Sequence, residues 1–261
     1  MADWDRRAGF DLTGKRALVV GFGNPAGEGV AIALAEAGAD VAVASATLDG
    51  DEVMAAKRAA KKVAALGRKS FSQGWDVTLP GNVQVGLRQI VKEIGKPEIL
   101  VYNADHALLK PIEKVTDAEF GHTQAVNLSG AFYASRSFVR ELGDAEGRII
   151  FLTSMLGERG VEHAAAYGAA RGGVVGLMAN LSQELGARRI TVNCISMGWM
   201  EWSAGGGPND ISANRLLRFI PLKRYGKAED VALFAVLLAS EGGAYLNGQV
   251  FHVDGGVLGH L

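Results

Sequence analysis

Short apolar segments alternate with longer Ala-rich segments along most of this chain, and turns of a few residues separate them. The apolar segments are typical of strands buried on both faces, at 17–20, 41–44, 70–77, 99–102, 148–152, 190–195 and 249–253. The intervening segments predict helices at 30–37, 52–66, 83–94, 117 to about 141, through 167 to 185, and 229–238. Because parallel strands need such crossovers, the alternation predicts an α/β fold, a doubly wound parallel sheet of about seven strands with helices on both faces.

Length and charge narrow the class of protein. The 261 residues suit one domain over 1–261, since α/β folds of this size form a single unit. The net charge is −1 and the Lys and Arg residues are scattered, so no nucleic-acid partner is expected. The start of the chain lacks the apolar core of a signal peptide, and no uncharged apolar run approaches the ~18 residues of a membrane span. We therefore expect a cytoplasmic protein with no membrane partner.

Cysteine and histidine give no sign of a metal or disulfide framework. The one cysteine, Cys194, excludes an intrachain disulfide, and it lies in an apolar run that predicts a core thiol. The five histidines have no spacing typical of metal ligands, so no metal site is expected.

A glycine-rich turn follows the first predicted strand and leads into a helix. Backbone N–H groups and the helix dipole at such a turn favour a pyrophosphate, and glycines allow its close approach. This context predicts that the cofactor binds at Gly21, Gly23, Gly27 and Gly29. A purely structural turn is the alternative.

The second strand should end near a residue that distinguishes NAD from NADP. An acidic side chain there would bind the ribose 2′-hydroxyl of NAD, but 44–47 contains no acidic and no basic residue. Ser45 is the candidate contact, and Thr47 could serve in the same way. NAD and NADP both stay open, with a slight preference for NADP because no carboxylate at this point would repel its 2′-phosphate.

Ser154, Tyr167 and Arg171 form a candidate catalytic group. Ser154 ends a predicted strand, and Tyr167 and Arg171 are four residues apart on a predicted helix, so they share a face. A fixed cation stabilises a phenolate and lowers the pKa of the phenol, which suits proton transfer. The alternative is a surface Tyr/Arg pair and a Ser that merely ends a strand.

The segment after the sixth strand, about 198–220, is irregular and predicts a lid over the substrate. It holds Trp199, Trp202 and three consecutive glycines at 205–207. The two tryptophans suggest a small apolar or ring-containing substrate. His163 is close to Tyr167 in sequence and is a further candidate for the substrate pocket.

Several features in order along the chain resemble a classical short-chain dehydrogenase/reductase over residues 12–258, a family with a Rossmann-like fold. Ser154 precedes Tyr167 by the family's interval of thirteen residues. The remaining features are Asp76-Val77, Asn103-Ala104 (of the family's Asn-Asn-Ala-Gly motif), Asn127, Arg188 to Asn193, Ala228 to Val231 and Val253 to Gly256.

The resemblance implies an NAD(P)-dependent oxidoreductase that interconverts a carbonyl and an alcohol, or reduces an activated double bond. In the family the Tyr exchanges a proton with the substrate oxygen, the Ser orients that oxygen, and a Lys four residues after the Tyr holds the nicotinamide ribose. The resemblance assigns Asn127 a structural and proton-relay role, and it implies a homodimer or homotetramer paired through helices near 117–141 and 164–187. It places further cofactor contacts at Asp76, Val77, Asn103, Ala104 and Gly198.

The chain departs from this family at three points. Arg171 stands where the family has Lys, and its planar guanidinium does not reproduce the contacts of an ammonium group. The glycine turn is two residues longer and contains Pro25, which removes a possible phosphate donor. Trp202 lies where a Thr commonly contacts the nicotinamide carboxamide.

Two alternatives follow from these departures. Halohydrin dehalogenases resemble this fold but use Ser, Tyr and Arg without a nicotinamide cofactor, and Ser154, Tyr167 and Arg171 match that triad. Residues typical of a nucleotide site favour the oxidoreductase over this cofactor-free lyase. The second alternative is a nucleotide-binding protein with little turnover.

Overall fold

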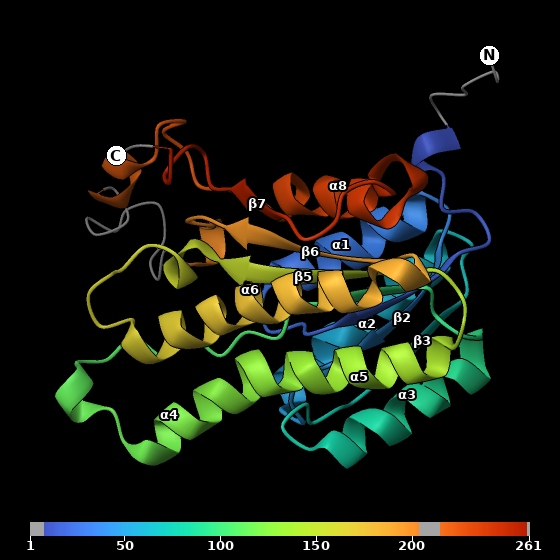
Figure 1. The fold of residues 1–261 in the computed structure, drawn as a ribbon, viewed down its shortest axis with the longest axis horizontal. Helices are drawn as coiled ribbons and strands as arrows, with labels where there is room; N and C mark the ends of the chain where they lie inside the picture. Colours follow the sequence, from blue (N-terminus) through green and yellow to red (C-terminus); the bar gives the residue numbers. More distant parts are fainter. Residues whose placement is uncertain (1–7, 204–214, 260–261) are drawn as a thin grey trace.

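In residues 8–203 and 215–259, which the computed structural model describes, seven parallel strands form one sheet in the order β3-β2-β1-β4-β5-β6-β7 (Figure 1). The chain starts near the middle of the sheet, builds outward to one edge, and then returns to build the other half. The direction in which successive strands are added reverses between β1 and β4, and α/β folds typically bind ligands at such a point. The strands are β1 (Arg16–Val20), β2 (Asp40–Ala44), β3 (Ser70–Gln73), β4 (Ile99–Tyr102), β5 (Gly147–Ser154), β6 (Ile190–Met197) and β7 (Val250–Val253).

Helices cover both faces of the sheet (Figure 1). They are α1 (Pro25–Glu36), α2 (Gly50–Ala65), α3 (Pro80–Ile94), α4 (Asp117–Gln124), α5 (Gly130–Leu142), α6 (Ala165–Leu185) and α8 (Ala228–Ala239). Buried residues of α1, α2 and α8 join one apolar cluster, and those of α3, α5 and α6 join a second on the opposite face. Val19 belongs to the first cluster and its neighbours Leu18 and Val20 to the second, which explains why the strands are apolar throughout.

The predicted fold is confirmed, while several element boundaries differ. α1 begins at Pro25 rather than at residue 30, because the side chain of Asn24 caps the helix by accepting a hydrogen bond from the Ala26 N–H. β3 ends at Gln73 rather than at residue 77. Both β5 and β6 extend two residues further than predicted, which makes Ser154 the last residue of β5.

The single helix predicted from 117 to about 141 consists of α4, a π-helical turn (Ala125–Ser129) and α5. A capping box starts α4 at Thr116 and Glu119, each side chain accepting a hydrogen bond from the other's backbone N–H. π-Helical turns often occur at functional sites, and this one carries Asn127.

Part of the predicted lid lies outside the described residues, including the glycines at 205–207. Its described ends contain a short 3-10 helix (Glu201–Ser203) and a second one (Leu217–Phe219). No helix in the described part of the chain is long and apolar enough to cross a lipid bilayer.

Candidate active site

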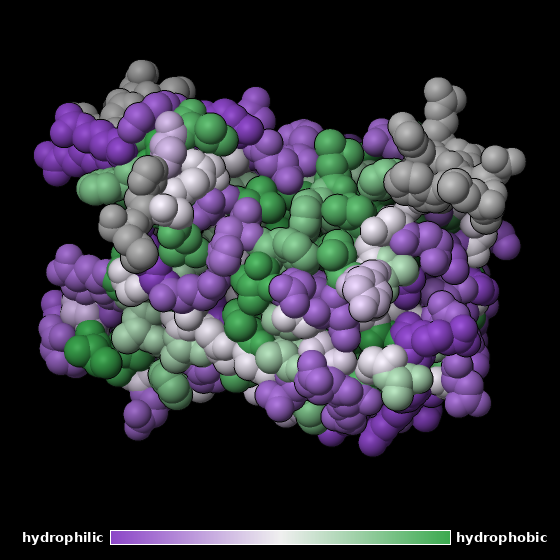
Figure 2. Space-filling model, turned by 45° about the horizontal axis from the view of Figure 1, so that its top comes forward, coloured by the Kyte–Doolittle hydropathy of each residue, from purple (hydrophilic) through white to green (hydrophobic). Residues whose placement is uncertain are grey.

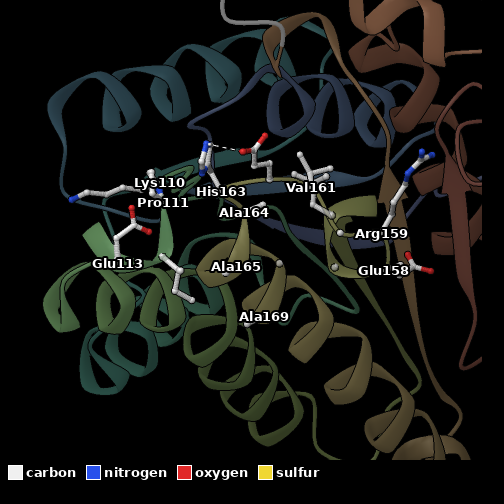
Figure 3. Close-up of a pocket in the computed structure, with 16 residues that line it drawn as sticks. Lys110, Pro111, Glu113, Glu158, Arg159, Val161, His163, Ala164, Ala165 and Ala169 are labelled. Carbon is white, nitrogen blue, oxygen red and sulfur yellow. Dashed lines mark ion pairs between the residues drawn. The ribbon is translucent and has the colours of Figure 1, made fainter.

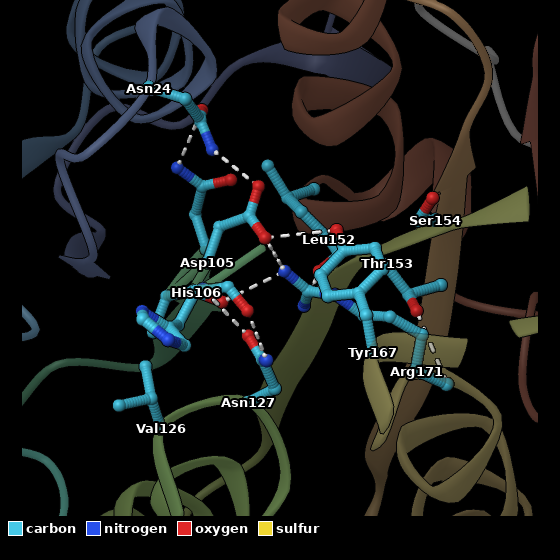
Figure 4. Close-up of polar contacts among 12 residues, drawn as sticks. Asn24, Asp105, His106, Val126, Asn127, Leu152, Thr153, Ser154, Tyr167 and Arg171 are labelled. Atoms are coloured by element: carbon cyan, nitrogen blue, oxygen red, sulfur yellow. Dashed lines mark hydrogen bonds and ion pairs between the residues drawn. The ribbon is translucent and has the colours of Figure 1, made fainter. Parts of the chain in front are cut away.

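The candidate catalytic residues meet at the carboxyl ends of β4 and β5 (Figure 4), beside the point between β1 and β4 where the strand order reverses. Ser154 ends β5, and Tyr167 and Arg171 lie in the first two turns of α6. The segment that follows β4 brings Asp105 between α6 and the glycine turn (Figure 4). The sequence analysis did not select Asp105.

Arg171 is fully buried and is held by three acceptors from two segments of the chain. Its Nη2 donates to Asp105 Oδ1 and to the Ala104 carbonyl at 3.2 Å, and its Nη1 donates to the Leu152 carbonyl at 3.4 Å. The charge of Arg171 is therefore paired with Asp105 in an almost water-free setting, since 2% of its side chain is exposed.

Tyr167 donates its phenolic hydrogen bond to the same oxygen, Asp105 Oδ1, at 2.9 Å. Burial raises the pKa of Tyr167 to about 12, although the charge of Arg171 lowers it, and Asp105 raises it further. Arg171 therefore lowers the pKa of Tyr167 as predicted, but the net pKa is raised instead of lowered. The physical reason is that desolvation and a carboxylate together outweigh the guanidinium.

Ser154 lies beside this group but is not part of its hydrogen-bond network (Figure 4). Its Oγ accepts a hydrogen bond from the Leu156 N–H at 3.2 Å, and in the described structure it is not bonded to Tyr167. The hydroxyl hydrogen thus stays available to a third molecule.

Asn127 forms its side-chain hydrogen bonds with the segment after β4, not with Tyr167 or Arg171. From the π-helical turn, its Oδ1 accepts from the His106 N–H and its Nδ2 donates to the His106 carbonyl, both at 2.9 Å. This pair of bonds fixes the backbone next to Asp105. The structure therefore gives Asn127 a structural contact, and its side-chain amide already has partners.

The glycine turn packs closely on the segment after β4. A Cβ at Gly21, which has φ of 100°, would lie 2.5 Å from the Ala104 N, and one at Gly27 would lie 2.2 Å from the Gly21 carbonyl. Gly29 faces Ala228 of α8, where a Cβ would come within 2.9 Å of the Ala228 side chain. Three of the four glycines are thus required by packing.

The same turn also has features that fit a dinucleotide. A Cβ at Gly23 would meet nothing within 4 Å, so the backbone there is open to a ligand. Asn103 Nδ2 donates to the Gly21 carbonyl at 3.0 Å, whereas its buried Oδ1 has no partner. An open turn at the start of α1 and an unpaired buried acceptor are what a phosphate and ribose binding site requires.

The end of β2 differs from the expectation. Ser45 is fully buried, its Oγ donating to the Thr47 carbonyl at 2.6 Å and accepting from the Trp75 N–H at 3.2 Å, so it is not free to bind a ribose. A carboxylate is present after all, because Glu52 reaches back from the first turn of α2. It accepts from the N–H groups of Phe22 (2.9 Å), Ala46 (2.8 Å) and Thr47 (3.0 Å).

The other expected cofactor residues have identifiable structural contacts. Asp76 Oδ1 accepts from the N–H and the hydroxyl of Thr78, and Val77 is fully buried and donates its N–H to the Ala46 carbonyl. A Cβ at Gly198 would come within 2.5 Å of Asp254 Cα, so this position needs glycine for packing.

The three predicted substrate-pocket residues lie apart. His163 lines a cavity of about 790 Å³ between the segment 156–165 and the segment 110–113 (Figure 3). Trp199 lines a different cavity of about 500 Å³ beside Asp254, while Trp202 packs against the core on the α1 and α8 face. Neither cavity is lined by Ser154 or Tyr167. The described structure therefore does not bring these three residues into one pocket.

Two functional candidates were missed by sequence reasoning, and each had a signal. Asp105 follows Asn103-Ala104, at the place where the quoted family motif has Gly. Glu52 lies in the first turn of the helix that follows β2, and this turn must lie near the end of the preceding strand. Within the described residues, no group of three or more His, Cys, Asp or Glu side chains is placed to hold a metal ion.

Comparisons with known proteins agree with this geometry. A protein family described as enoyl-(acyl carrier protein) reductase matches residues 24–258. A 3-oxoacyl-[acyl-carrier-protein] reductase of Staphylococcus epidermidis is 32% identical over 93% of this chain and 98% of its own length.

Solved structures are similarly close. A short-chain type dehydrogenase/reductase from Mycobacterium marinum is 31% identical with a TM-score of 0.85, covering 95% of this chain and 97% of its own. A blue fluorescent protein from a metagenomic library, in complex with NADPH, is 29% identical with a TM-score of 0.87, covering 95% of this chain and 99% of its own.

Proposed function

Because this chain belongs to the classical short-chain dehydrogenase/reductase family and is an oxidoreductase of that type, we propose that it interconverts a carbonyl and an alcohol with NAD(P). The observation that carries the proposal is the phenol of Tyr167, held by a charged pair beside the open glycine turn. The substrate is a small molecule that reaches the space next to Ser154 and Tyr167.

The residues of this chain divide the work. The nicotinamide cofactor, when bound, supplies or accepts the hydride. Tyr167 gives a proton to the substrate oxygen or takes one from it, and Ser154 orients that oxygen through its unbonded hydroxyl hydrogen. Gly23 and Asn103 would hold the dinucleotide, and Asn127 fixes the segment between them and α6.

The proposed choice between NAD and NADP rests on Glu52. The sequence-based preference for NADP depended on the absence of a carboxylate at the end of β2, and Glu52 places one there. Although three similar solved structures are described with bound NADP or NADPH, we infer a preference for NAD in this chain, because Glu52 occupies backbone donors and would repel a 2′-phosphate.

The dehalogenase alternative gains no support. That reaction needs Tyr167 as a phenolate, whereas burial raises the pKa of Tyr167 to about 12 and the charge of Arg171 is paired with Asp105. A nucleotide-binding protein with little turnover remains an outcome of the test below.

Titration of the purified protein with NADH and NADPH, followed by cofactor fluorescence, is the decisive measurement. We expect saturable binding of NADH and its oxidation when a panel of small ketones, aldehydes and activated enones is added. Failure to bind either cofactor would contradict the oxidoreductase assignment. Tight binding without oxidation across the panel would favour the low-turnover alternative, and halide release from a vicinal halohydrin without cofactor would favour the dehalogenase.

Tyr167→Phe tests the assignment of roles. We expect turnover to fall by at least about 100-fold, because the proton donor is gone, while the Kd for NADH stays within about twofold. Equal loss of binding and turnover would mean that Tyr167 shapes the cofactor site instead. Tyr133→Phe, a substitution of the same size on α5, is the matched control.

A further inference from the structure

Asp105 is the one residue that contacts both Tyr167 and Arg171 through its side chain in the described structure (Figure 4). Its Oδ1 accepts from both, and its Oδ2 lies 3.4 Å from Asn24 Nδ2 at the start of α1. About a fifth of the Asp105 side chain is exposed, so this carboxylate connects a buried phenol with solvent.

The other ionisable groups near this pair do not compete for the phenolic proton. Burial and the neighbouring His122 lower the pKa of His106, which follows Asp105. Burial raises the pKa values of Tyr102 on β4 and Cys194 on β6, so both remain protonated and uncharged at neutral pH. Asp105 is therefore the anion that faces Tyr167 and Arg171.

The side-chain amide of Asn127 is not free to take part in the proton relay expected for the family. Its amide oxygen and nitrogen are both bonded to the backbone of His106, and the residue is fully buried. The phenol of Tyr167 instead points at Asp105, with 2.9 Å between the two oxygens.

We propose that Asp105 is the proton partner of Tyr167, exchanging with solvent the proton that Tyr167 exchanges with the substrate. This inference rests on the oxidoreductase function proposed above. In alcohol oxidation the substrate O–H bond breaks and its proton bonds to Tyr167 Oη. The Oη–H bond that pointed at Asp105 breaks in turn, and its proton bonds to Asp105 Oδ1. Oxidised nicotinamide, when bound, would accept the hydride that balances the reaction. Asp105 then releases the proton to water, and carbonyl reduction runs through the same steps in reverse.

The pH dependence of Asp105→Asn tests the proposal. Without the carboxylate, the phenolic proton must pass directly to hydroxide. We therefore expect alcohol oxidation at pH 7 to fall by about 100-fold and then to rise about tenfold per pH unit between pH 7 and 10. The wild-type profile should be flat over that range. Asp105→Glu, which keeps a carboxylate, should recover at least about a tenth of the wild-type rate, and Asp117→Asn on α4 is the exposed control.

A readout without cofactor separates this inference from the proposed function. Tyrosinate absorbance of the protein alone, with the Tyr167→Phe spectrum subtracted, reports the ionisation of Tyr167. Because Asp105 raises the pKa of Tyr167, Asp105→Asn should ionise Tyr167 at lower pH than the wild type. If the wild type does not bind the cofactor, the proposed oxidoreductase function is overturned. If the tyrosinate titration is unchanged in Asp105→Asn, the role of Asp105 is overturned.

A second variant is needed in case Asp105→Asn fails to fold, because that substitution leaves the buried Arg171 unpaired. Asp105→Asn/Arg171→Lys relieves this strain, since a buried Lys can lose its proton, and it should show the same rising pH profile. A flat profile in a folded variant, or equal inactivity of the Asn and Glu variants at position 105, would overturn the proposal.

Discussion

The Asp105 carboxylate offsets the effect that the charge of Arg171 has on the pKa of Tyr167. From the sequence, Arg171 is a cation beside Tyr167 and should favour its phenolate. In the structure Arg171 is paired with Asp105, and burial together with Asp105 raises the pKa of Tyr167 to about 12, so Tyr167 is a protonated phenol at neutral pH. Asp105 also raises the pKa of Arg171, together with Tyr167 and against the effect of burial.

A double-mutant cycle measures this pair. Arg171→Met leaves the Asp105 carboxylate without its partner and should lower the free energy of unfolding in urea by about 3 kcal/mol. Asp105→Asn/Arg171→Met removes both charges, so we expect it to be more stable than the sum of the single changes by about 1 kcal/mol or more. Additive effects would mean that the two charges do not interact.

At the scale of elements, the glycine turn and the start of α1 serve packing and binding with different residues. Gly27 approaches the Gly21 carbonyl of the same turn, whereas Gly23 faces open space. The two glycines are four residues apart in one motif. Substitution by Ala should nevertheless reduce stability at Gly27 and cofactor binding at Gly23.

Gly27→Ala and Gly23→Ala form a matched pair. A Cβ at Gly27 would lie 2.2 Å from the Gly21 carbonyl, so the backbone must shift, and we expect a loss of about 1–3 kcal/mol in thermal or urea unfolding. Gly23→Ala should leave the unfolding free energy within about 0.5 kcal/mol and weaken NADH binding instead. Undiminished NADH affinity in Gly23→Ala would show that the cofactor does not lie over this turn.

The contact between α2 and the end of β2 predicts the cofactor preference. Because the Glu52 carboxylate would repel a 2′-phosphate, NADH should bind at least about tenfold more tightly than NADPH. Glu52→Gln should narrow this ratio, while Asp51→Asn, an exposed neighbour in the same helical turn, should not. Tighter binding of NADPH to the wild type would contradict the role given to Glu52.

The whole molecule offers two faces on which copies of the chain could pair. Small residues form an exposed stripe along α6, at Ala165, Ala169, Gly176 and Ala179. On the side that bears α8 and β7, apolar side chains gather in a band across the middle of the surface (Figure 2). Leu233 of α8 is 70% exposed, and β7 is the edge strand of the sheet. Two different self-complementary faces generate a tetramer, so we expect a homotetramer, or a homodimer if one face pairs alone.

Gly176→Arg tests the α6 face. A Cβ at Gly176 would meet nothing within 4 Å, so the substitution fits the single chain and any effect reports on contact with another copy. We expect light scattering coupled to size exclusion to show half the wild-type mass. Gly81→Arg on α3, where a Cβ also meets nothing within 4 Å, should keep the wild-type mass. An unchanged mass in Gly176→Arg would exclude α6 from the interface.

Sequence reasoning predicted the fold and the main site residues because these depend on local patterns. Apolar runs and amphipathic segments show the order of strands and helices, and Tyr167 and Arg171 share a face by helical spacing alone. Boundaries were less exact. The local cap of Asn24 on the Ala26 N–H was overlooked, and the π-helical turn carries Asn127, whose side chain bonds the distant segment after β4.

The sequence by itself determined the alternating architecture, the family and the presence of Ser154, Tyr167 and Arg171 at one end of the sheet. Only the tertiary structure decided what surrounds them. Asp105 meets Arg171 across 66 positions of sequence, and Glu52 meets Phe22 across 30. The pKa of Tyr167 and the charge at the end of β2 both depend on such contacts. Burial and charge at a point in space are set by whichever segments the fold brings there, and no periodicity along the chain records them.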